Sequence, residues 1–440
     1  MRDQQRYVSA GGARARFRTV RYSLISRTDP MVSMNHLREE LVLEHMTHVS
    51  ELWRRRALIV RSRAHGLNGL WRLDEKLRAH IDGIAAAGNL GWKVARGLPR
   101  CTEGGEVFAM LILAGLRRDR DCLEETVSDY LGQDFALPAV ISALAWLGSE
   151  LVMPIVEDWL NYHEPAWRGA ALAVCVARRS DPGAAIDRGL LDGDGEVRRQ
   201  AARACEVFGC RTMMPTLAAL ASGGSDELRF AVARALHVLG DPAGPERLWR
   251  HALTETTNRE EAAELATRNA PMPIVRSWLD DASRDPGLHR VVVTGAAATG
   301  DLECVPRLLE ALHEPGVAAL AGFGLRVIVG LDIEASGLVS EQRASSDAEL
   351  PRPDAERVHR WWHANRRRFD GGPRYMLGRP FGRRALEEAL HRGPQRVRFL
   401  AVHDLHRMRH GYSVPFEIDA PAWRQLRWLG CPRGSSLLRA

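Results

Sequence analysis

A segment of about 30 residues recurs along this chain, and this repeat constrains the fold more than any other feature. The stretches VRRQAARACEVFG (197–209), LRFAVARALHVLG (228–240) and LHRVVVTGAAATG (288–300) each begin with an apolar residue and close with glycine. The register extends to eight starts spaced 29–31 residues apart, which are residues 107, 136, 167, 197, 228, 259, 288 and 317. A repeat of this length indicates that one supersecondary unit stacks on the next.

In all eight repeats the residue seven positions after the start is small, and a small side chain there would let two helices approach closely. The closing glycines suit left-handed helix caps, and a second helix signal follows each cap, often opened by proline. We therefore predict an all-α fold, a right-handed α-solenoid of about eight helix hairpins with helical N- and C-terminal caps. The small residues are Ala114, Ala143, Val174, Ala204, Ala235, Ala266, Gly295 and Gly324, the glycines are Gly148, Gly209, Gly240 and Gly300, and the prolines are Pro154, Pro215, Pro245, Pro273 and Pro306.

The repeat pattern VRRQAARACEVFG followed by MMPTLAAL resembles the short, bacterial type of HEAT repeat. The C-terminal stretches WWHANRRRFDGGPRYMLGRPF and APAWRQLRWL, with EHMTHVSELWRRR near the N-terminus, resemble a bacterial HEAT-repeat protein family that is frequently encoded in type VI secretion gene clusters. The resemblance covers roughly residues 34–430. It implies an accessory protein associated with type VI secretion and implies no particular chemistry.

We expect four parts along the chain. Residues 1–33 are a basic tail whose composition predicts disorder, and helical periodicity begins only after Met34, which suggests a mis-called start. Residues 34–106 are predicted to form an N-terminal helical cap, residues 107–345 the repeats, and residues 351–430 a basic C-terminal helical cap.

Charge is divided unevenly among these parts. The balance is +5 for residues 1–33, −10 for residues 34–350 and +11 for residues 351–440. A basic end attached to an acidic body is expected either to fold back on that body or to dock on an acidic partner.

Composition also bears on the compartment. No run of about 18 apolar residues occurs, so we expect no membrane span. The seven cysteines form no CxxC pair, and such an odd, unpatterned set favours a reducing, cytoplasmic setting.

The stretch WWHANRRRFDGG (361–372) allows two interpretations: a platform that stacks on bases, or one amphipathic helix. Asp354 is predicted to cap a helix that begins at Ala355. Both tryptophans fall on the same helical face, with Val358, Asn365 and Phe369, so we favour a buried stripe. Arg366, Arg367 and Arg368 would then occupy the last turn, where cations favour the helix dipole.

The following segment, GGPRYMLGRPFG (371–382), is too rich in glycine and proline for a regular helix. Loops of this kind often carry binding function. We expect this loop to project, with Arg374 and Arg379 pairing with carboxylates of a protein partner and Tyr375 anchoring it. Arg366 and Arg367 complete the candidate partner-binding set.

Other motifs fail on spacing or context. DGDGEVRRQAAR (192–203) has Val197 and Arg203 where an EF-hand needs glycine and glutamate, so Asp194 is expected to be a helix N-cap instead. The glycine-rich stretches VVVTGAAATG and AGFGLRVIVG lie inside the helical register, not between a strand and a helix. His45 and His48 would bind metal only with ligands from a second helix such as His80, and a solvated polar face is favoured.

Two functions from different classes follow. The long repeat and the absence of a P-loop, HExxH or GxSxG motif favour a non-catalytic protein-interaction scaffold with no cofactor, metal or membrane partner. The alternative is a HEAT-like nucleic-acid-binding protein or DNA-repair glycosylase, which would need a basic groove. The acidic repeat segment argues against that alternative.

Overall fold

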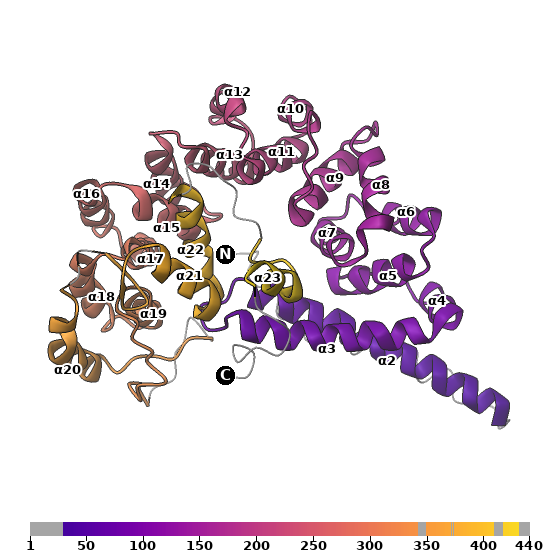
Figure 1. The fold of residues 1–440 in the computed structure, drawn as a ribbon, viewed down its shortest axis with the longest axis horizontal. Coiled ribbons are helices and arrows are strands. Elements are labelled where there is room, and N and C mark those ends of the chain that lie inside the picture. The colour runs from indigo at the N-terminus through magenta and orange to yellow at the C-terminus, as the bar shows by residue number, and fades with distance from the viewer. Residues whose placement is uncertain (1–29, 342–348, 371, 373, 409–416, 431–440) are drawn as a thin grey trace. The chain divides into compact units, whose positions relative to one another are not determined.

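Helix hairpins at the predicted spacing make up most of the computed structural model, which describes residues 30–341, 349–370, 372, 374–408 and 417–430 (Figure 1). The predicted tail lies outside the described residues as far as residue 29. The chain divides into two compact units. Unit 1 contains the described residues up to Leu58, Leu70–Ser180 and Ala420–Ala422, and unit 2 contains Ile59–Gly69, the described residues of Asp181–Asp419 and those from Trp423 onward.

Unit 1 holds two long helices and the first helices of three repeats. An ion pair with an Nε–Oδ1 distance of 2.7 Å joins Arg56 of the first long helix to the buried Asp74 of the second. In the repeats, α5 stacks on α7 and α7 stacks on α9. The helices are α2 (Pro30–Ile59), α3 (Leu67–Ala86), α4 (Gly88–Arg96), α5 (Gly104–Leu116), α6 (Arg120–Ser128), α7 (Leu137–Trp146), α8 (Ser149–Trp159) and α9 (Pro165–Arg178).

Unit 2 holds the remaining repeats and the C-terminal elements. Its repeat elements are α10 (Ala185–Leu190), α11 (Gly195–Phe208), η2 (Arg211–Met213), α12 (Met214–Leu220), α13 (Asp226–Leu239), α14 (Gly244–Thr254), α15 (Arg259–Asn269), α16 (Met272–Ala282), η3 (Pro286–Leu288), α17 (His289–Thr299), η4 (Leu302–Cys304), α18 (Val305–Ala311) and α19 (Ala318–Val329). The C-terminal elements are α20 (Ala355–Asn365), η5 (Arg366–Arg368), β1 (Tyr375–Met376), β2 (Arg379–Pro380), α21 (Arg383–Arg392), α22 (Gln395–Met408) and α23 (Ala422–Trp428).

The predicted repeat register is confirmed. The eight predicted starts each fall within three residues of the observed start of α5, α7, α9, α11, α13, α15, α17 or α19. All eight small residues of the register are buried. In unit 2, helices α11, α13, α15, α17 and α19 pack on one another in this order, as small interface residues allow.

The predicted helix boundaries are mostly correct. Gly209, Gly240 and Gly300 follow their helices with left-handed φ values of 72°, 100° and 71°. Gly148 was predicted to do the same and does not: it is extended, with φ −62° and ψ 144°, and precedes α8. For the same reason Pro154 lies inside α8, whereas the other four prolines stand in the first turn of their helices.

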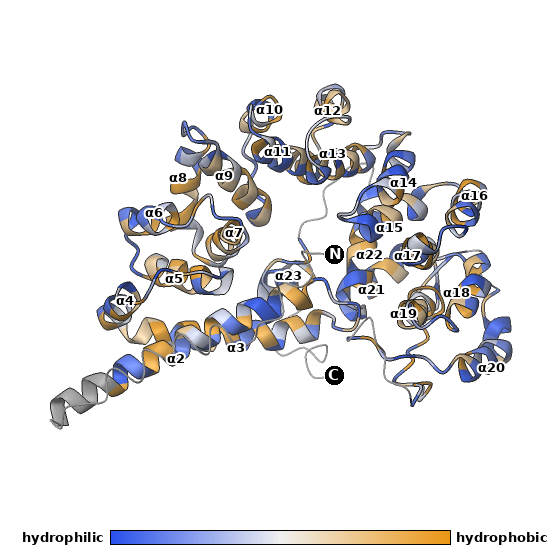
Figure 2. Cartoon of the chain, turned by 180° about the vertical axis from the view of Figure 1, so that it is seen from behind, coloured by the Kyte–Doolittle hydropathy of each residue, from blue (hydrophilic) through white to orange (hydrophobic). Residues whose placement is uncertain are grey.

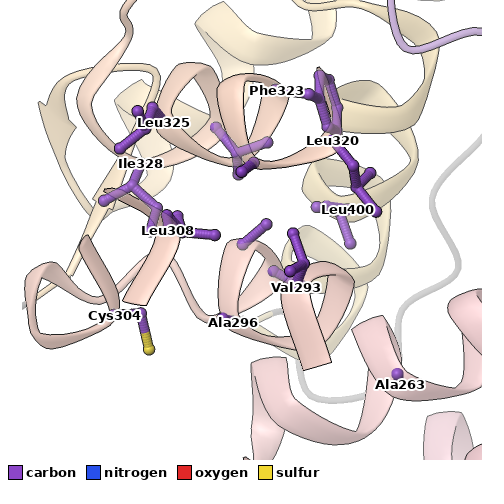
Figure 3. Close-up of a cluster of buried hydrophobic side chains, with 14 of the residues drawn as sticks. Ala263, Val293, Ala296, Cys304, Leu308, Leu320, Phe323, Leu325, Ile328 and Leu400 are labelled. Carbon is purple, nitrogen blue, oxygen red and sulfur yellow. The ribbon is translucent and has the colours of Figure 1, made fainter. Parts of the chain in front are cut away.

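The hydrophobic core of unit 2 runs between the helices of successive repeats and continues into the C-terminal helices. Figure 3 shows Val293 and Ala296 of α17 facing Leu308 of α18 and Leu320 of α19. Leu400 of α22 belongs to the same cluster. The C-terminal helices of unit 2 are therefore packed into the repeats through a shared core.

Candidate protein-interaction surface

Helix α22 folds back on the repeats, where it packs on α13 and forms ion pairs with α15 (Figure 1). Arg396 at its N-terminal end pairs with Glu264 and, at an Nη1–Oε2 distance of 3.1 Å, with Glu261, both on α15. Arg234 of α13 bridges the same Glu261 and Glu206 of α11, each at 2.8 Å. The uneven charge along the chain predicted either folding back or docking, and here folding back accounts for part of the basic excess.

A second ion pair joins α22 to α15 deeper in the core. Arg268 has no exposed side-chain surface and donates from Nε to Asp404 Oδ2 at 2.7 Å. Its Nη1 donates to the carbonyl of Ala298, at 2.5 Å. Removing both charged groups from water costs free energy that offsets much of their attraction. The main effect of this contact is therefore to specify the position of α22 on α15, and its net contribution to stability is small.

The environment of Arg396 shifts the pKa values of two α15 carboxyl groups, Glu261 and Glu264, in opposite directions. Burial acts to raise the pKa of Glu261, but the guanidinium groups of Arg396 and Arg234 outweigh it and lower that pKa to about 2. Glu264, which lacks Arg234 as a partner, has a pKa raised by burial. Burial also holds the pKa of His403 on α22 well below its usual value, so this imidazole stays neutral at neutral pH.

Glu261→Gln is expected to destabilise unit 2 in a pH-dependent way. The pKa of Glu261 falls from 4.5 to about 2 on folding, so its stabilising contribution is present above pH 4.5 and is lost as the pH falls toward 2. The difference in unfolding free energy between wild type and variant should be about 1–3 kcal/mol at pH 7 and should shrink at pH 3. Urea denaturation across this pH range measures it. Glu264 titrates in both proteins, so a difference that is constant with pH would contradict the role of Glu261.

The segment predicted as a projecting loop is instead a β-hairpin held on the repeats. Strands β1 and β2 pair Tyr375 with Pro380 and Met376 with Arg379. The turn residues Leu377 and Gly378 both have positive φ, 51° and 78°, as a tight two-residue hairpin requires.

The hairpin backbone is hydrogen-bonded to the C-terminal ends of two repeat helices, α17 and α19. The N–H groups of Leu377 and Gly378 donate to the carbonyls of Val327 and Ile328, at 2.8 and 3.0 Å, at the end of α19. The N–H of Tyr375 donates to Gly300 O at 2.7 Å. A Cβ on Gly300 would lie 2.6 Å from Tyr375 O, so the cap glycine also admits the strand.

The predicted roles of Tyr375 and Arg374 are therefore corrected. Only 1% of Tyr375 is exposed, and its ring contacts Phe369 edge to face, so it cannot anchor a partner. Arg374 donates from Nε to Thr299 O at 3.1 Å and lies over the ring of Phe381. Both side chains therefore hold the hairpin against the repeats. The hairpin backbone adds to this attachment, because its N–H groups donate to helix-end carbonyls that lack an intrahelical partner.

Arg379 remains at the surface but already has a partner. About half of its side chain is exposed, and its Nε lies 2.6 Å from Oε2 of Glu388 on α21. An external carboxylate would have to compete with Glu388, so Arg379 is a weaker candidate than the sequence indicated.

A group of unpaired arginines lies on α20 and η5. Arg357, Arg360, Arg366 and Arg367 are exposed, and none of their guanidinium groups has an ion pair or hydrogen bond within the described part of the chain. We name these four residues the arginine face. Hydrophilic residues dominate α20 in Figure 2. Within α20 and η5 the one acidic residue is Glu356, and Asp354 and Asp370 flank the two elements.

The opposite side of α20 explains why the face is rigid. Asp354 accepts a hydrogen bond from the N–H of Arg357 at 3.0 Å, so the predicted N-cap and the start at Ala355 are confirmed. Val358 is fully buried, and Trp361 and Trp362 are partly buried against the core. Trp362 stacks on Phe369. The tryptophans thus pack inward, as the stripe predicted, and do not form a platform for bases.

Sequence reasoning found half of the arginine face. Arg366 and Arg367 were among the candidates, and both are exposed. Arg357 and Arg360 were missed, although they stand in the same helix. The available signal was helical periodicity: Arg360 and Arg367 lie two turns apart, opposite the apolar stripe.

The histidines of unit 1 do come together across two helices. Nδ1 of His45 on α2 lies 2.9 Å from Nδ1 of His80 on α3, and the ring of His48 lies 4.6 Å from that of His80. No group of three or more histidine, cysteine or carboxylate ligands suited to a metal ion occurs among the described residues. Burial and the neighbouring histidines lower the pKa of His80.

Unit 1 also contains a cavity of about 330 Å³, lined by residues that include Arg96, Arg100, Cys101 and Tyr130. Burial raises the pKa of the Cys101 thiol to about 11, so the thiol is protonated at neutral pH. A protonated thiol is a poor nucleophile. The cavity therefore offers no activated group for covalent catalysis at Cys101.

Comparison with protein families supports the repeat. The family model of HEAT repeats matches residues 186–268, from α10 into α15. No curated protein and no solved structure matches the chain. Among the described helices, none is long and apolar enough to cross a membrane. The match and the hairpin register together support a HEAT-repeat protein, an architecture suited to a scaffold for interactions.

Proposed function

We propose that this HEAT-repeat protein is a non-catalytic scaffold of the bacterial cytoplasm whose arginine face binds an acidic segment of a protein partner. One observation carries the proposal: four exposed arginines without partners occur within 11 residues of α20 and η5, while most other arginines of the described chain are paired. Two of the four, Arg360 and Arg367, share the side of the helix opposite the apolar stripe. Many of the other guanidinium groups pair with carboxylates of the same chain, as at Arg229, Arg234 and Arg290.

Arginine and helix geometry both suit this role. The planar guanidinium group can pair with a carboxylate through two parallel hydrogen bonds. Helix α20 is fixed by its cap and its buried stripe, so binding would not have to order its backbone. A helix of 11 residues presents a face about 16 Å long, enough for a short acidic segment.

A protein is favoured over a nucleic acid as the partner. Base stacking would need accessible aromatic rings, and Trp361 and Trp362 pack against the core. Backbone binding would need a longer basic surface, whereas residues 34–350 have a net charge of −10.

The family resemblance supports a source for the partner. The segments around Trp361 and Trp362 resemble proteins encoded in type VI secretion gene clusters, so a type VI secretion component is the proposed partner. Co-purification from the native bacterium, followed by mass spectrometry, tests this choice separately from the binding surface.

Arg360→Glu with Arg367→Glu is expected to weaken binding of an oligo-glutamate peptide by at least about tenfold, because two attractive contacts become repulsive. Fluorescence anisotropy with a labelled peptide measures the change, and circular dichroism checks the fold. The matched control is Arg250→Glu with Arg284→Glu, which reverses two exposed arginines on other elements. Equal loss in both double variants would show only a net-charge effect. Tighter binding of a DNA duplex of equal charge would support the nucleic-acid alternative and contradict the proposal.

A further inference from the structure

Two cysteines meet at the C-terminal end of α11, in unit 2. The helix ends at Phe208, Gly209 takes a left-handed φ of 72°, and the N–H of Cys210 donates to the carbonyl of Cys205 at 3.0 Å. This bond from the second residue after a helix back to its last turn defines a Schellman cap, which brings the side chains of these two positions together. Here both side chains are thiols, and each lies close enough to the other to shift its pKa.

The two thiols differ in access and in acidity. Cys205 is fully buried, whereas Cys210 is partly exposed. The neighbouring Cys205 thiol lowers the pKa of Cys210, against the opposing effects of burial and of the carboxylates of Asp181 and Asp187. The Cys210 sulfur, together with burial, raises the pKa of Cys205. The accessible sulfur is therefore the more nucleophilic one, and the buried sulfur stands behind it.

We propose that Cys205 and Cys210 form an oxidation site, in which hydrogen peroxide converts the pair to an intramolecular disulfide that thiol reductants reverse. The Cys210 thiolate attacks one peroxide oxygen, the O–O bond breaks, hydroxide leaves, and Cys210 becomes a sulfenic acid. The Cys205 sulfur then attacks the Cys210 sulfur, the S–O bond breaks, and water leaves with the Cys205 proton. The two cysteines lose two electrons in total, and the peroxide is reduced to water.

The arrangement matches what such chemistry requires. Oxidation-sensitive cysteines are accessible, acidic for a thiol, and placed next to a second cysteine that resolves the sulfenic acid. Cys101, Cys122 and Cys304 are unlike Cys210, because burial raises their pKa. The pair is also separate from the arginine face, so the inference does not depend on the proposed function.

A disulfide here would close a small ring across the cap between α11 and η2. It would fix the left-handed Gly209 and the start of the chain toward α12. These elements form one hairpin of the segment that matches HEAT repeats. Oxidation would thus act on the connection inside a single repeat and would leave the stacking residue Ala204, which is on the same helix and fully buried, in place.

Trypsin gives a direct readout, because both cysteines lie in one peptide, Ala204–Arg211, between Arg203 and Arg211. The full chain is treated with hydrogen peroxide, remaining thiols are blocked with N-ethylmaleimide, and the digest is measured by mass spectrometry. We expect this peptide to lose two hydrogen atoms, to take up no blocking reagent, and to recover both thiols after dithiothreitol.

Variants separate the two roles. Cys205→Ser should leave a sulfenic acid at Cys210 that dimedone traps, and Cys210→Ser should leave Cys205 unmodified. Cys122→Ser is the matched control at a partly exposed thiol without a neighbouring one, and it should not alter disulfide formation. Circular dichroism checks that each variant folds. In the wild type, an Ala204–Arg211 peptide that keeps both thiols under conditions that oxidise Cys122 would overturn the proposal.

Discussion

Asp404→Ala is expected to lower the unfolding free energy of unit 2 by about 3–5 kcal/mol, because it leaves the Arg268 guanidinium buried without a counter-ion. The Arg268 side chain is entirely buried, and its Nε and Nη2 both face Asp404 Oδ2. A charge in this position cannot reach water unless α22 moves. Urea denaturation followed by tryptophan fluorescence measures the loss, and α22 should become the site of early proteolysis.

A matched ion pair on the surface provides the control. Asp280 pairs with Arg307, but 61% of its side chain is exposed. Asp280→Ala should therefore cost at most about 1 kcal/mol, as exposed ion pairs contribute little. Similar small losses in both variants would mean that Arg268 finds water or another acceptor, and that Asp404 does not hold α22.

Tyr375→Ala is expected to destabilise the protein by about 3–5 kcal/mol, as the loss of a buried aromatic ring does. The ring is almost completely buried and contacts Phe369, while the backbone of Tyr375 is bound to the end of α17. Removing the ring leaves a cavity under the hairpin, so hydrogen exchange at Leu377 and Gly378 should also become faster.

Two further variants distinguish a structural role from partner binding. Trp361→Ala should cost less than Tyr375→Ala, because Trp361 is only partly buried. Arg379→Glu should cost about 1 kcal/mol or less, because its ion pair with Glu388 is exposed on the arginine side. If Tyr375→Ala were neutral and Arg379→Glu strongly destabilising, the hairpin would not be anchored by its aromatic residue.

The repeat could be predicted because its signal is local. Helix spacing, small interface residues and glycine caps are all written within about 30 residues, and the predicted starts agree with the observed helices within three residues. The prediction that Gly148 ends a helix was wrong, because a glycine suits either end of a helix. Whether it ends one helix or precedes the next depends on the backbone conformation of Leu147. Leu147 is extended, with ψ 165°, so Gly148 opens α8.

The hairpin could not be predicted by the same means. Its place is decided by carbonyls at Gly300, Val327 and Ile328, which are 50 or more residues away from their donors at Tyr375, Leu377 and Gly378. Leu377 also adopts a positive φ that leucine rarely takes. Composition correctly excluded a helix, but a segment rich in glycine and proline can project or dock, and only the tertiary partners decide between them.

The candidate surface shows the same limit. Exposure of Arg366 and Arg367 follows from helical periodicity, which is local, whereas pairing of Arg374 with Thr299 and of Arg396 with Glu261 depends on distant residues. The number of arginines therefore indicates a basic C-terminal segment. Which of these arginines bond to other residues of the chain and which remain exposed follows only from the tertiary structure.

The fold-back of α22 makes it a tethered ligand of the chain's own repeats. A segment joined covalently to its site has an effective concentration on the order of millimolar. A separate helix that competes for α13 and α15 would have to overcome that concentration and also break the buried contact between Arg268 and Asp404. Selection among partners on this face is therefore strict, and weak competitors stay unbound even when they are abundant.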